Sequence, residues 1–234
     1  MRRHSKYWAF LIVLTVLGAA VGTLAFFLQH EPDFYRSEWN SPADSDDSVL
    51  SGQVLTKLDT LMNDLKDNRQ TTWGSSYSAE ELNAFFRDRQ SGNNPLIAGL
   101  LGDVPEPRFA IRGDHLLIAF RYGEGRLSTV ITLELKVWLV KDQANLLAIQ
   151  FIGFRAGAVP LPKYLILDRF AEMARKHNAD VNWYRHDGQP VALCQLYANQ
   201  TRPDSQISTL KITDGRLMIG GKHSQASLPQ GVGP

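Results

Sequence analysis

Hydrophobic and polar residues alternate along residues 126–140, which read RLSTVITLELKVWLV. One set of alternate positions is almost entirely apolar, whereas the other set includes Glu134 and Lys136. A period of two is typical of a strand that buries one face and exposes the other. The turn-forming residues 142–145 separate this stretch from a second apolar one at 146–157. The pattern therefore predicts a long antiparallel hairpin.

Three shorter hairpins are predicted from the same period and from turn residues. Residues 108–122 contain two short alternating runs on either side of Gly113–Asp114. The pairs Asp187–Gly188 and Asp214–Gly215 each lie between two apolar runs, and an Asp-Gly pair favours a tight two-residue turn. The chain from residue 108 onward is thus expected to be rich in antiparallel strands.

Three helices are predicted outside the N-terminal segment. Apolar residues recur at spacings of three and four along residues 51–68, which predicts a helix with one buried stripe. A second helix is expected at 79–89, because Ser78 and Glu81 form a capping box before an apolar run. A third is expected at about 160–178, where prolines are tolerated in the first turn.

The sequence therefore predicts an α+β fold, in which an N-terminal transmembrane helix is followed by one domain at residues 48–221. The domain is expected to contain a long, twisted, mostly antiparallel sheet of about seven or eight strands, packed against two or three helices. The apolar residues 96–101 lie between glycines and prolines and are compatible with either a buried turn or a mobile lid.

The N-terminal segment has the properties of a membrane anchor. Residues 7–28 carry no charge, and these 22 residues are long enough to cross a hydrocarbon core of roughly 30 Å as a helix. Arg2, Arg3 and Lys6 precede the segment, whereas the residues after it are mainly acidic. By the positive-inside rule, residues 1–6 are expected in the cytoplasm and the domain outside it, so a single-pass cell-membrane protein is predicted.

A cleaved signal peptide is the alternative, since Gly18, Ala19 and Ala20 offer small residues to a peptidase. The uncharged run continues for eight residues beyond them, which is longer than a signal peptide requires and favours an uncleaved anchor. Residues 29–47 are rich in proline, serine and acidic residues and are expected to form a flexible linker. A disordered tail is expected at 222–234.

Composition and charge restrict the classes of function. The chain has 234 residues, of which 44% are hydrophobic and 21% charged, as expected of a globular domain with one membrane segment. Its net charge is +1, and three positive charges lie in the first six residues, so the rest has no basic excess with which to bind nucleic acid. Cys194 is the one cysteine, which excludes an intrachain disulfide and a cysteine-rich metal site. Its apolar neighbours indicate a buried, unreactive thiol.

Catalytic motifs are absent from the sequence, which has no Gly-x-Ser-x-Gly, His-Glu-x-x-His or Cys-x-x-Cys pattern. The candidates for hydrolysis or metal binding are Asp114, His115, His186 and Asp187. An Asp-His neighbour in a hairpin turn usually contacts solvent. We therefore expect no enzyme activity, no cofactor and no metal site, with a hydrolase as a minor alternative.

The apolar face of the long hairpin is the candidate ligand-binding surface. A long twisted hairpin wrapped around a helix encloses an elongated apolar trough. Its inward side chains line either a packed core or a ligand channel, and the sequence leaves both open. The residues predicted to contact a ligand are Ile131, Leu133, Leu135, Val137, Ile149 and Phe151.

Several features occur together in a known class of protein. The single anchor, the Glu-Leu-Asn run at 81–83, the long alternating strands and the Gly-Ala-Val-Pro-Leu-Pro segment at 157–162 resemble small membrane-anchored bacterial envelope proteins. Some of those are similar to the tubular lipid-binding (TULIP-like) fold. The resemblance covers residues 76–221 and implies binding of a lipid or another apolar ligand at the membrane face.

Two functions are therefore hypothesised. The first is a membrane-anchored extracytoplasmic binding module for a lipid or other apolar ligand. The alternative is an envelope assembly or scaffold protein, which would use its sheet face or its first helix to contact another protein.

Overall fold

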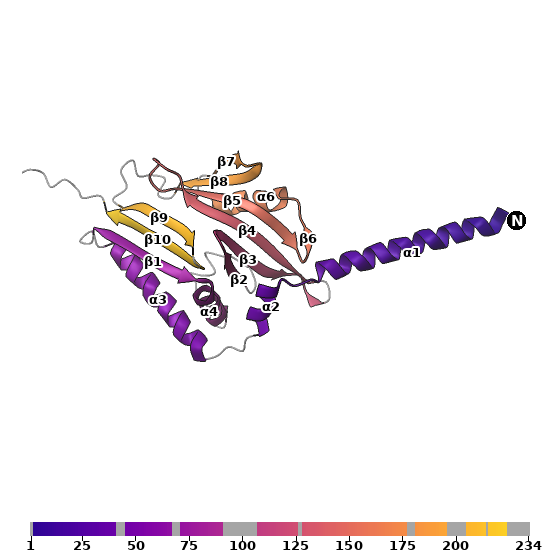
Figure 1. Ribbon diagram of the computed structural model, residues 1–234, viewed down its shortest axis with the longest axis horizontal. Coiled ribbons are helices and arrows are strands. Elements are labelled where there is room, and N and C mark those ends of the chain that lie inside the picture. Colours follow the sequence, from indigo (N-terminus) through magenta and orange to yellow (C-terminus); the bar gives the residue numbers. More distant parts are fainter. Residues whose placement is uncertain are drawn as a thin grey trace, which may run out of the picture.

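The computed structural model describes residues 2–40, 45–66, 71–90, 107–125, 128–176, 181–195, 205–213 and 215–223. A long N-terminal helix points away from a domain of sheets and shorter helices (Figure 1). The helices are α1 (Arg2–Leu28), α2 (Asp33–Asn40), α3 (Ser45–Lys66), α4 (Ala79–Gln90) and α6 (Tyr164–Lys176).

The strands form two antiparallel sheets. The larger sheet has the order β2-β3-β4-β5-β8-β7, with β6 paired to the end of β5, and the smaller has the order β1-β10-β9. The strands are β1 (Thr72–Ser78), β2 (Arg108–Arg112), β3 (His115–Tyr122), β4 (Thr129–Leu139), β5 (Leu146–Ala156), β6 (Val159–Pro160), β7 (Val181–His186), β8 (Gln189–Gln195), β9 (Ser205–Thr213) and β10 (Arg216–His223). The predicted α+β fold with a large antiparallel sheet and a few helices is confirmed.

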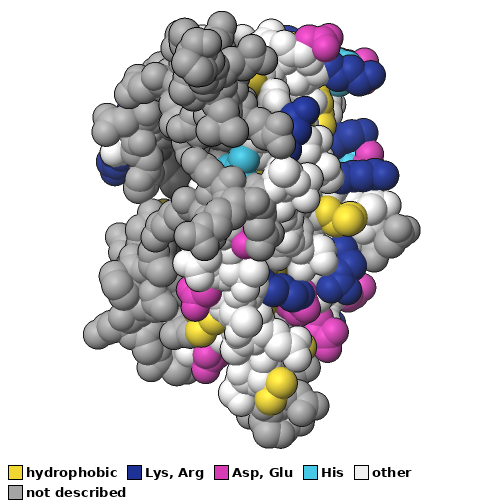
Figure 2. All heavy atoms as spheres, turned by 90° about the vertical axis from the view of Figure 1, so that its left-hand side faces the viewer, with side chains coloured by type: hydrophobic (Ala, Val, Ile, Leu, Met, Phe, Trp, Pro, Cys, Tyr) yellow, Lys and Arg dark blue, Asp and Glu magenta, His cyan; other side chains and the backbone are white. Residues whose placement is uncertain are grey.

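Helix α1 has the length and composition predicted for the N-terminal segment. Residues Phe10–Leu28 are apolar enough to cross a membrane, with a mean hydropathy of 2.5, and they are not buried inside the protein. The surface at the end of the domain opposite α1 is polar rather than apolar. Figure 2 shows basic and acidic side chains mixed there, with only scattered hydrophobic ones among the described residues.

The predicted long hairpin is confirmed as β4 and β5, which have 11 residues each. Their register places Leu135 opposite Phe151 and Val137 opposite Ile149. A β-bulge after Glu134 shifts the register by one residue and increases the local twist. The alternating side chains therefore face the sides of the sheet that the sequence predicts.

The length of this hairpin is explained by what lies at its two ends. At the start of β4, the hydroxyl of Thr129 donates a hydrogen bond of 2.6 Å to the carbonyl oxygen of Leu28, at the end of α1. In the opposite turn, the side-chain oxygen of Asn145 accepts a 2.7 Å hydrogen bond from the backbone N–H of Ile207 in β9. The hairpin thus connects α1 to the small sheet.

The prediction of a flexible linker at 29–47 is wrong for much of this segment, because Asp33–Asn40 form helix α2. Tyr35 of this helix is 0% exposed and packs against Ala119 and Val130 of the large sheet. The composition of the segment does not reveal this contact, because a single aromatic ring can bury as much area as several smaller side chains. The segment after α1 is therefore docked on the domain.

Beside the predicted large sheet the structure has a second, smaller one, because β9 and β10 pair with β1 rather than with the large sheet. Strand β1 is not predicted from the sequence, because its residues TWGSSYS are mostly small and polar. Trp73 and Tyr77 are its buried side chains. The last strand also extends to His223, so residues 222–223 do not belong to a tail. Residues 224–234 and the predicted turn or lid at 96–101 lie outside the described residues.

Helices α3 and α4 pack against the small sheet through the buried side chains of Val54, Tyr77 and Phe85. Asn83, in the Glu-Leu-Asn run, joins α4 to the large sheet. Its side chain is buried, donates a 2.8 Å hydrogen bond to the carbonyl of Phe109 and accepts one of 2.7 Å from the N–H of the same residue. These two bonds pair the free edge of β2 as a neighbouring strand would.

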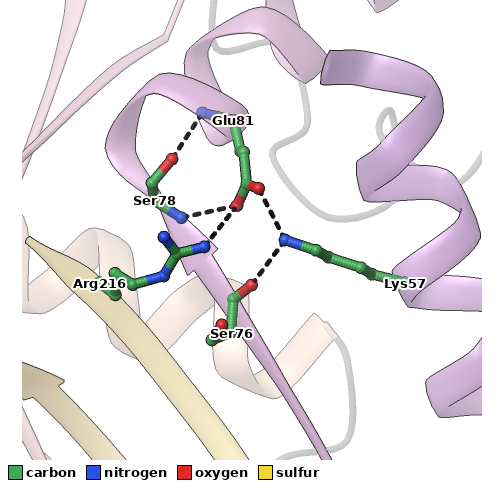
Figure 3. Close-up of polar contacts among 5 residues, drawn as sticks. All are labelled: Lys57, Ser76, Ser78, Glu81 and Arg216. Atoms are coloured by element: carbon green, nitrogen blue, oxygen red, sulfur yellow. Dashed lines mark hydrogen bonds and ion pairs between the residues drawn. The ribbon is translucent and has the colours of Figure 1, made fainter. Parts of the chain in front are cut away.

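The predicted capping box at the start of α4 is confirmed (Figure 3). The Ser78 N–H donates to a Glu81 carboxylate oxygen at 2.9 Å, and the Glu81 N–H donates to the Ser78 hydroxyl at 3.1 Å. Lys57 of α3 donates to the same carboxylate at 2.6 Å, and Arg216 of β10 lies 3.7 Å from it. Burial by itself raises the pKa of Glu81, but the Lys57 and Ser78 hydrogen bonds and the charges of Lys57 and Arg216 outweigh burial and lower its pKa.

Replacing this carboxylate is expected to destabilise the protein in a pH-dependent way. Glu81→Gln should lower the free energy of unfolding by about 2 kcal/mol at pH 7, since charge-assisted hydrogen bonds to Lys57 and Ser78 are weakened. Because the folded-state pKa of Glu81 is depressed, its contribution is complete above the unfolded-state value of about 4.3 and is lost as the pH falls through the folded-state pKa. Urea titration of the full-length protein in a maltoside detergent at pH 7 and below pH 4 measures both effects.

Glu80→Gln is the matched control, because Glu80 is the exposed neighbour on the same helix turn. It should change stability by less than about 0.5 kcal/mol. Equal losses in the two variants, or a Glu81→Gln loss that persists in acid, would contradict the assigned network.

Candidate functional site

The six residues predicted to contact a ligand lie on one face of the large sheet, as the alternation and the register of β4 and β5 require. We call this side the apolar face. Neighbouring strands extend it, because Ile118 and Phe120 of β3 pair with Leu133 and Ile131 of β4. It runs from the end of the sheet beside α1 to the opposite end, where β5 pairs with β8.

Helix α6 packs on part of the apolar face and forms a compact cluster with it. Phe151 is 2% exposed and is packed with Leu135 and Ile149, and Phe170 of α6 lies over them. The ring of Phe151 contacts Phe170 edge-on, with a centroid separation of 5.3 Å, and lies 5.8 Å from the ring of Trp183. Three of the six predicted residues are therefore packed beneath α6, as a core would be.

The other predicted residues lie outside that cluster. Ile131, near the anchor, is buried. Leu133 and Val137 are half-buried, as are Ile118 and Phe120 on the neighbouring strand. A partly exposed apolar strip thus continues from the α6 cluster toward α1, and a ligand role for these side chains stays a prediction.

A cavity of about 360 Å³ lies beside the α6 cluster, between α6 and strand β7. Leu167 and Ala171 line it from the helix, and Trp183 lines it from the strand. Trp183 remains 38% exposed although its ring also touches Phe170. Arg185 and Asp168 are the charged residues of the lining. The sequence shows the amphipathic helix and the aromatic strand, but not that they face each other across a cavity.

The free cysteine belongs to the same region. Cys194 of β8 is buried in the α6 cluster, and burial raises the pKa of its thiol. A thiol with a raised pKa is a poor nucleophile at neutral pH. The prediction that Cys194 is buried is confirmed, and its lack of reactivity stays a prediction.

The two Asp-His pairs proposed for a hydrolase, Asp114–His115 and His186–Asp187, lie in different hairpins and do not form one site. His115 is on β3 and His186 on β7, and strands β4, β5 and β8 lie between them in the large sheet. Each pair has local partners: His115 Nδ1 lies 2.7 Å from Glu134, and Gln150 donates a hydrogen bond to the backbone of His186. Among the described residues, no group of three or more His, Cys, Asp or Glu side chains is placed to hold a metal ion.

The junction of α1 with the domain is closely packed. Besides the bond from Thr129, the N–H of Ala158 donates a 2.9 Å hydrogen bond to the carbonyl of Phe27. Arg121 of β3 forms an ion pair of 2.7 Å with Glu31. The last carbonyls of a helix have no partner within the helix, so these donors cap α1 and fix the domain against it.

Comparisons of the chain with protein-family models, curated proteins and solved structures found no match. The candidate site is therefore interpreted from its own geometry. The resemblance to membrane-anchored envelope proteins with a TULIP-like fold stays a prediction.

Proposed function

We propose that this protein is a membrane-anchored binding module that takes a lipid, or another ligand with an apolar chain, between α6 and the large sheet. The observation that carries this proposal is the apolar face, which runs from the capped end of α1 to the cavity between α6 and β7. One end of the apolar face thus lies beside the segment that enters the membrane, and the other end adjoins a cavity.

The size and lining of the cavity support this proposal. Small-molecule sites usually have volumes of about 300 to 1,000 Å³ and are mostly apolar, with a few polar groups that orient the ligand. The cavity of about 360 Å³ fits this range. Each methylene group of an acyl chain that leaves water for such a surface contributes about 0.8 kcal/mol. Arg185 at the lining offers a partner for an acidic headgroup.

The proposed location follows from the charge distribution around α1. Arg2, Arg3 and Lys6 stand at its N-terminal end. We place this end in the cytoplasm and the domain on the outer side of the cell membrane, held close to the bilayer by the junction with Phe27 and Leu28.

Native mass spectrometry of the full-length protein, extracted from membranes in a maltoside detergent, tests the proposal. We expect a co-purified species of lipid mass. Ala171→Trp fills the cavity from α6 and should reduce the lipid-bound fraction about tenfold, because a bulky side chain then occupies the ligand's space. Arg175→Trp adds the same group at an exposed position of the same helix and should leave the lipid-bound fraction unchanged.

A protein without bound lipid, or equal effects of the two tryptophan variants, would overturn the proposal.

A soluble fragment for the same test should begin at residue 29 rather than at residue 48. A later start would remove Tyr35 from the core of the large sheet.

The alternative, a scaffold protein, is favoured by one observation. β7 is an edge strand of the large sheet, and five of its six residues are exposed, including Trp183 and Tyr184. An exposed edge strand can pair with a strand of another protein. Cross-linking through β7 in intact membranes would support this function.

A further inference from the structure

A second cavity, of about 190 Å³, lies on the other face of the large sheet, beside the end of α1. His30 and Phe34 line it from the segment that follows the anchor, and Arg112 and Arg155 line it from strands β2 and β5. Thr132 of β4 forms part of its wall. The register places Thr132 opposite Arg155, so the side chains of these two residues lie on the same side of the sheet.

The lining of this cavity is positively charged. None of the described residues that line it is acidic, whereas Arg112, Arg155 and His30 are basic. The Arg112 guanidinium lies 5.7 Å from the centre of the Phe34 ring, which orients it without neutralising it.

Two acidic residues close to the lining residues in the sequence or on the strands have partners of their own. Glu31, next to His30, forms an ion pair of 2.7 Å with Arg121. Glu134, two residues beyond Thr132, lies 2.7 Å from a ring nitrogen of His115. The lining itself therefore carries the positive charges of Arg112 and Arg155, while Asp33, between the lining residues Pro32 and Phe34, is an exposed carboxylate outside the lining.

The Thr132 hydroxyl gives an independent indication of a polar ligand. Thr132 is 8% exposed, and its hydroxyl oxygen has no hydrogen-bond partner among the described residues. Buried hydroxyl groups are normally paired, because an unpaired one is destabilising. The hydroxyl oxygen is buried, so the Thr132 side chain has to rotate toward the cavity before a ligand oxygen can supply that partner.

The cavity lies beside the end of the helix that we propose as the membrane anchor. Gly157 and Ala158 line the cavity, and Ala158 is hydrogen-bonded to Phe27, one residue before the end of the membrane-spanning segment. The headgroup layer of a bilayer extends roughly 5 to 8 Å beyond the hydrocarbon core on each side. With α1 in the membrane, as proposed above, the cavity lies at the depth of lipid phosphates, so this inference rests on the proposed membrane anchoring.

We propose that Arg112, Arg155, His30 and Thr132 bind a phosphate group, supplied by a phospholipid headgroup or by free phosphate. Arginine recognises phosphate oxygens through paired N–H donors, and the threonine hydroxyl adds a neutral donor. This site is independent of the apolar-ligand site, because the two lie on opposite faces of the large sheet. Its role is to hold the domain in a fixed orientation on the bilayer.

The test measures the unfolding midpoint of the full-length protein in a maltoside detergent at constant ionic strength. The three additions are dihexanoylphosphatidylglycerol, sodium phosphate, and dihexanoylglycerol, which has the same acyl chains without phosphate. A rise with the phospholipid alone assigns the site to a headgroup, and a rise with both phosphate compounds assigns it to phosphate in general. No rise with either phosphate compound, or an equal rise with dihexanoylglycerol, would overturn the proposal.

Two variants link the effect to the cavity. Arg112→Gln combined with Arg155→Gln should raise the concentration for half-maximal stabilisation at least about tenfold. Arg169→Gln combined with Arg175→Gln removes two exposed arginines of α6 and should leave that concentration unchanged. Equal shifts in the two double variants would show a general charge effect and overturn the proposal.

Thr132→Val keeps the shape of the side chain and removes the unpaired hydroxyl. It therefore tests phosphate binding by the cavity even if the arginine double variant does not fold. We expect an unfolding midpoint without ligand that is equal to or above that of the parent protein, together with phosphate-group binding about three- to fivefold weaker. Unchanged binding in this variant would overturn the role of Thr132 and, with it, the assignment of the cavity.

Discussion

Replacing Phe151 with alanine is expected to lower the free energy of unfolding by about 3 to 5 kcal/mol, as for other large buried aromatic residues. Phe151 is 2% exposed and lies between β5 and α6, where its ring touches those of Phe170 and Trp183. The variant would leave a cavity at the centre of this cluster and release α6 from the sheet. Urea unfolding of the full-length protein, followed by tryptophan fluorescence, measures the loss.

The same variant separates the two interpretations of the apolar face. Leu165→Ala is the control, since Leu165 belongs to the same helix but is exposed, and it should cost less than about 1 kcal/mol. If Phe151→Ala left stability unchanged and reduced the lipid-bound fraction, Phe151 would line a ligand channel rather than a core. A large loss of stability would confine the channel to the half-buried strip toward α1 and to the cavity beside β7.

The parts of the fold that the sequence predicts are those with local physical causes. The hairpin turns after β2, β7 and β9 contain residues with positive backbone φ angles, at Gly113, Asp187, Gly188 and Gly215. Glycine and aspartate adopt such angles readily, so a short stretch of sequence is enough to identify these turns. The capping box of Ser78 and Glu81 is equally local.

The parts that the sequence does not predict depend on contacts between distant residues. β1 pairs with β10, more than a hundred residues further along the chain, and its small residues give no apolar alternation. Gly221 of β10 lies so close to the Trp73 ring that no side chain fits there. The need for glycine at position 221 therefore comes from the partner strand β1, and the sequence of β10 alone does not show it.

The same distinction applies to the candidate sites. The alternation of β4 predicts correctly that Leu133, Leu135 and Val137 share one face. It does not show that α6 covers only some of them, because this depends on the path of the chain after Pro162. The cavity proposed to bind phosphate brings together His30, Arg112 and Arg155, which no spacing in the sequence relates.

Replacing Gly157 with alanine is expected to release the anchor from the domain. Gly157 has a φ angle of 57°, which disfavours any side chain, and an added Cβ would overlap the backbone oxygens of Phe27 and Leu28. The strain and the clash together should cost about 3 kcal/mol of stability. The hydrogen bonds that Ala158 and Thr129 donate to α1 would break, and α2 would lose its support.

Gly113→Ala is the matched control for this change, because Gly113 has nearly the same φ angle, 60°, and open space around it. Its cost should be about 1 kcal/mol, from backbone strain alone. The difference between the two variants thus isolates the contact with α1. Tryptic cleavage after Arg36, in α2, should become faster in Gly157→Ala and stay slow in Gly113→Ala, since only the first variant undocks the segment that follows the anchor. Similar cleavage rates in both would mean that the domain is not held against the end of α1, and the proposed depth of the phosphate cavity would fail with it.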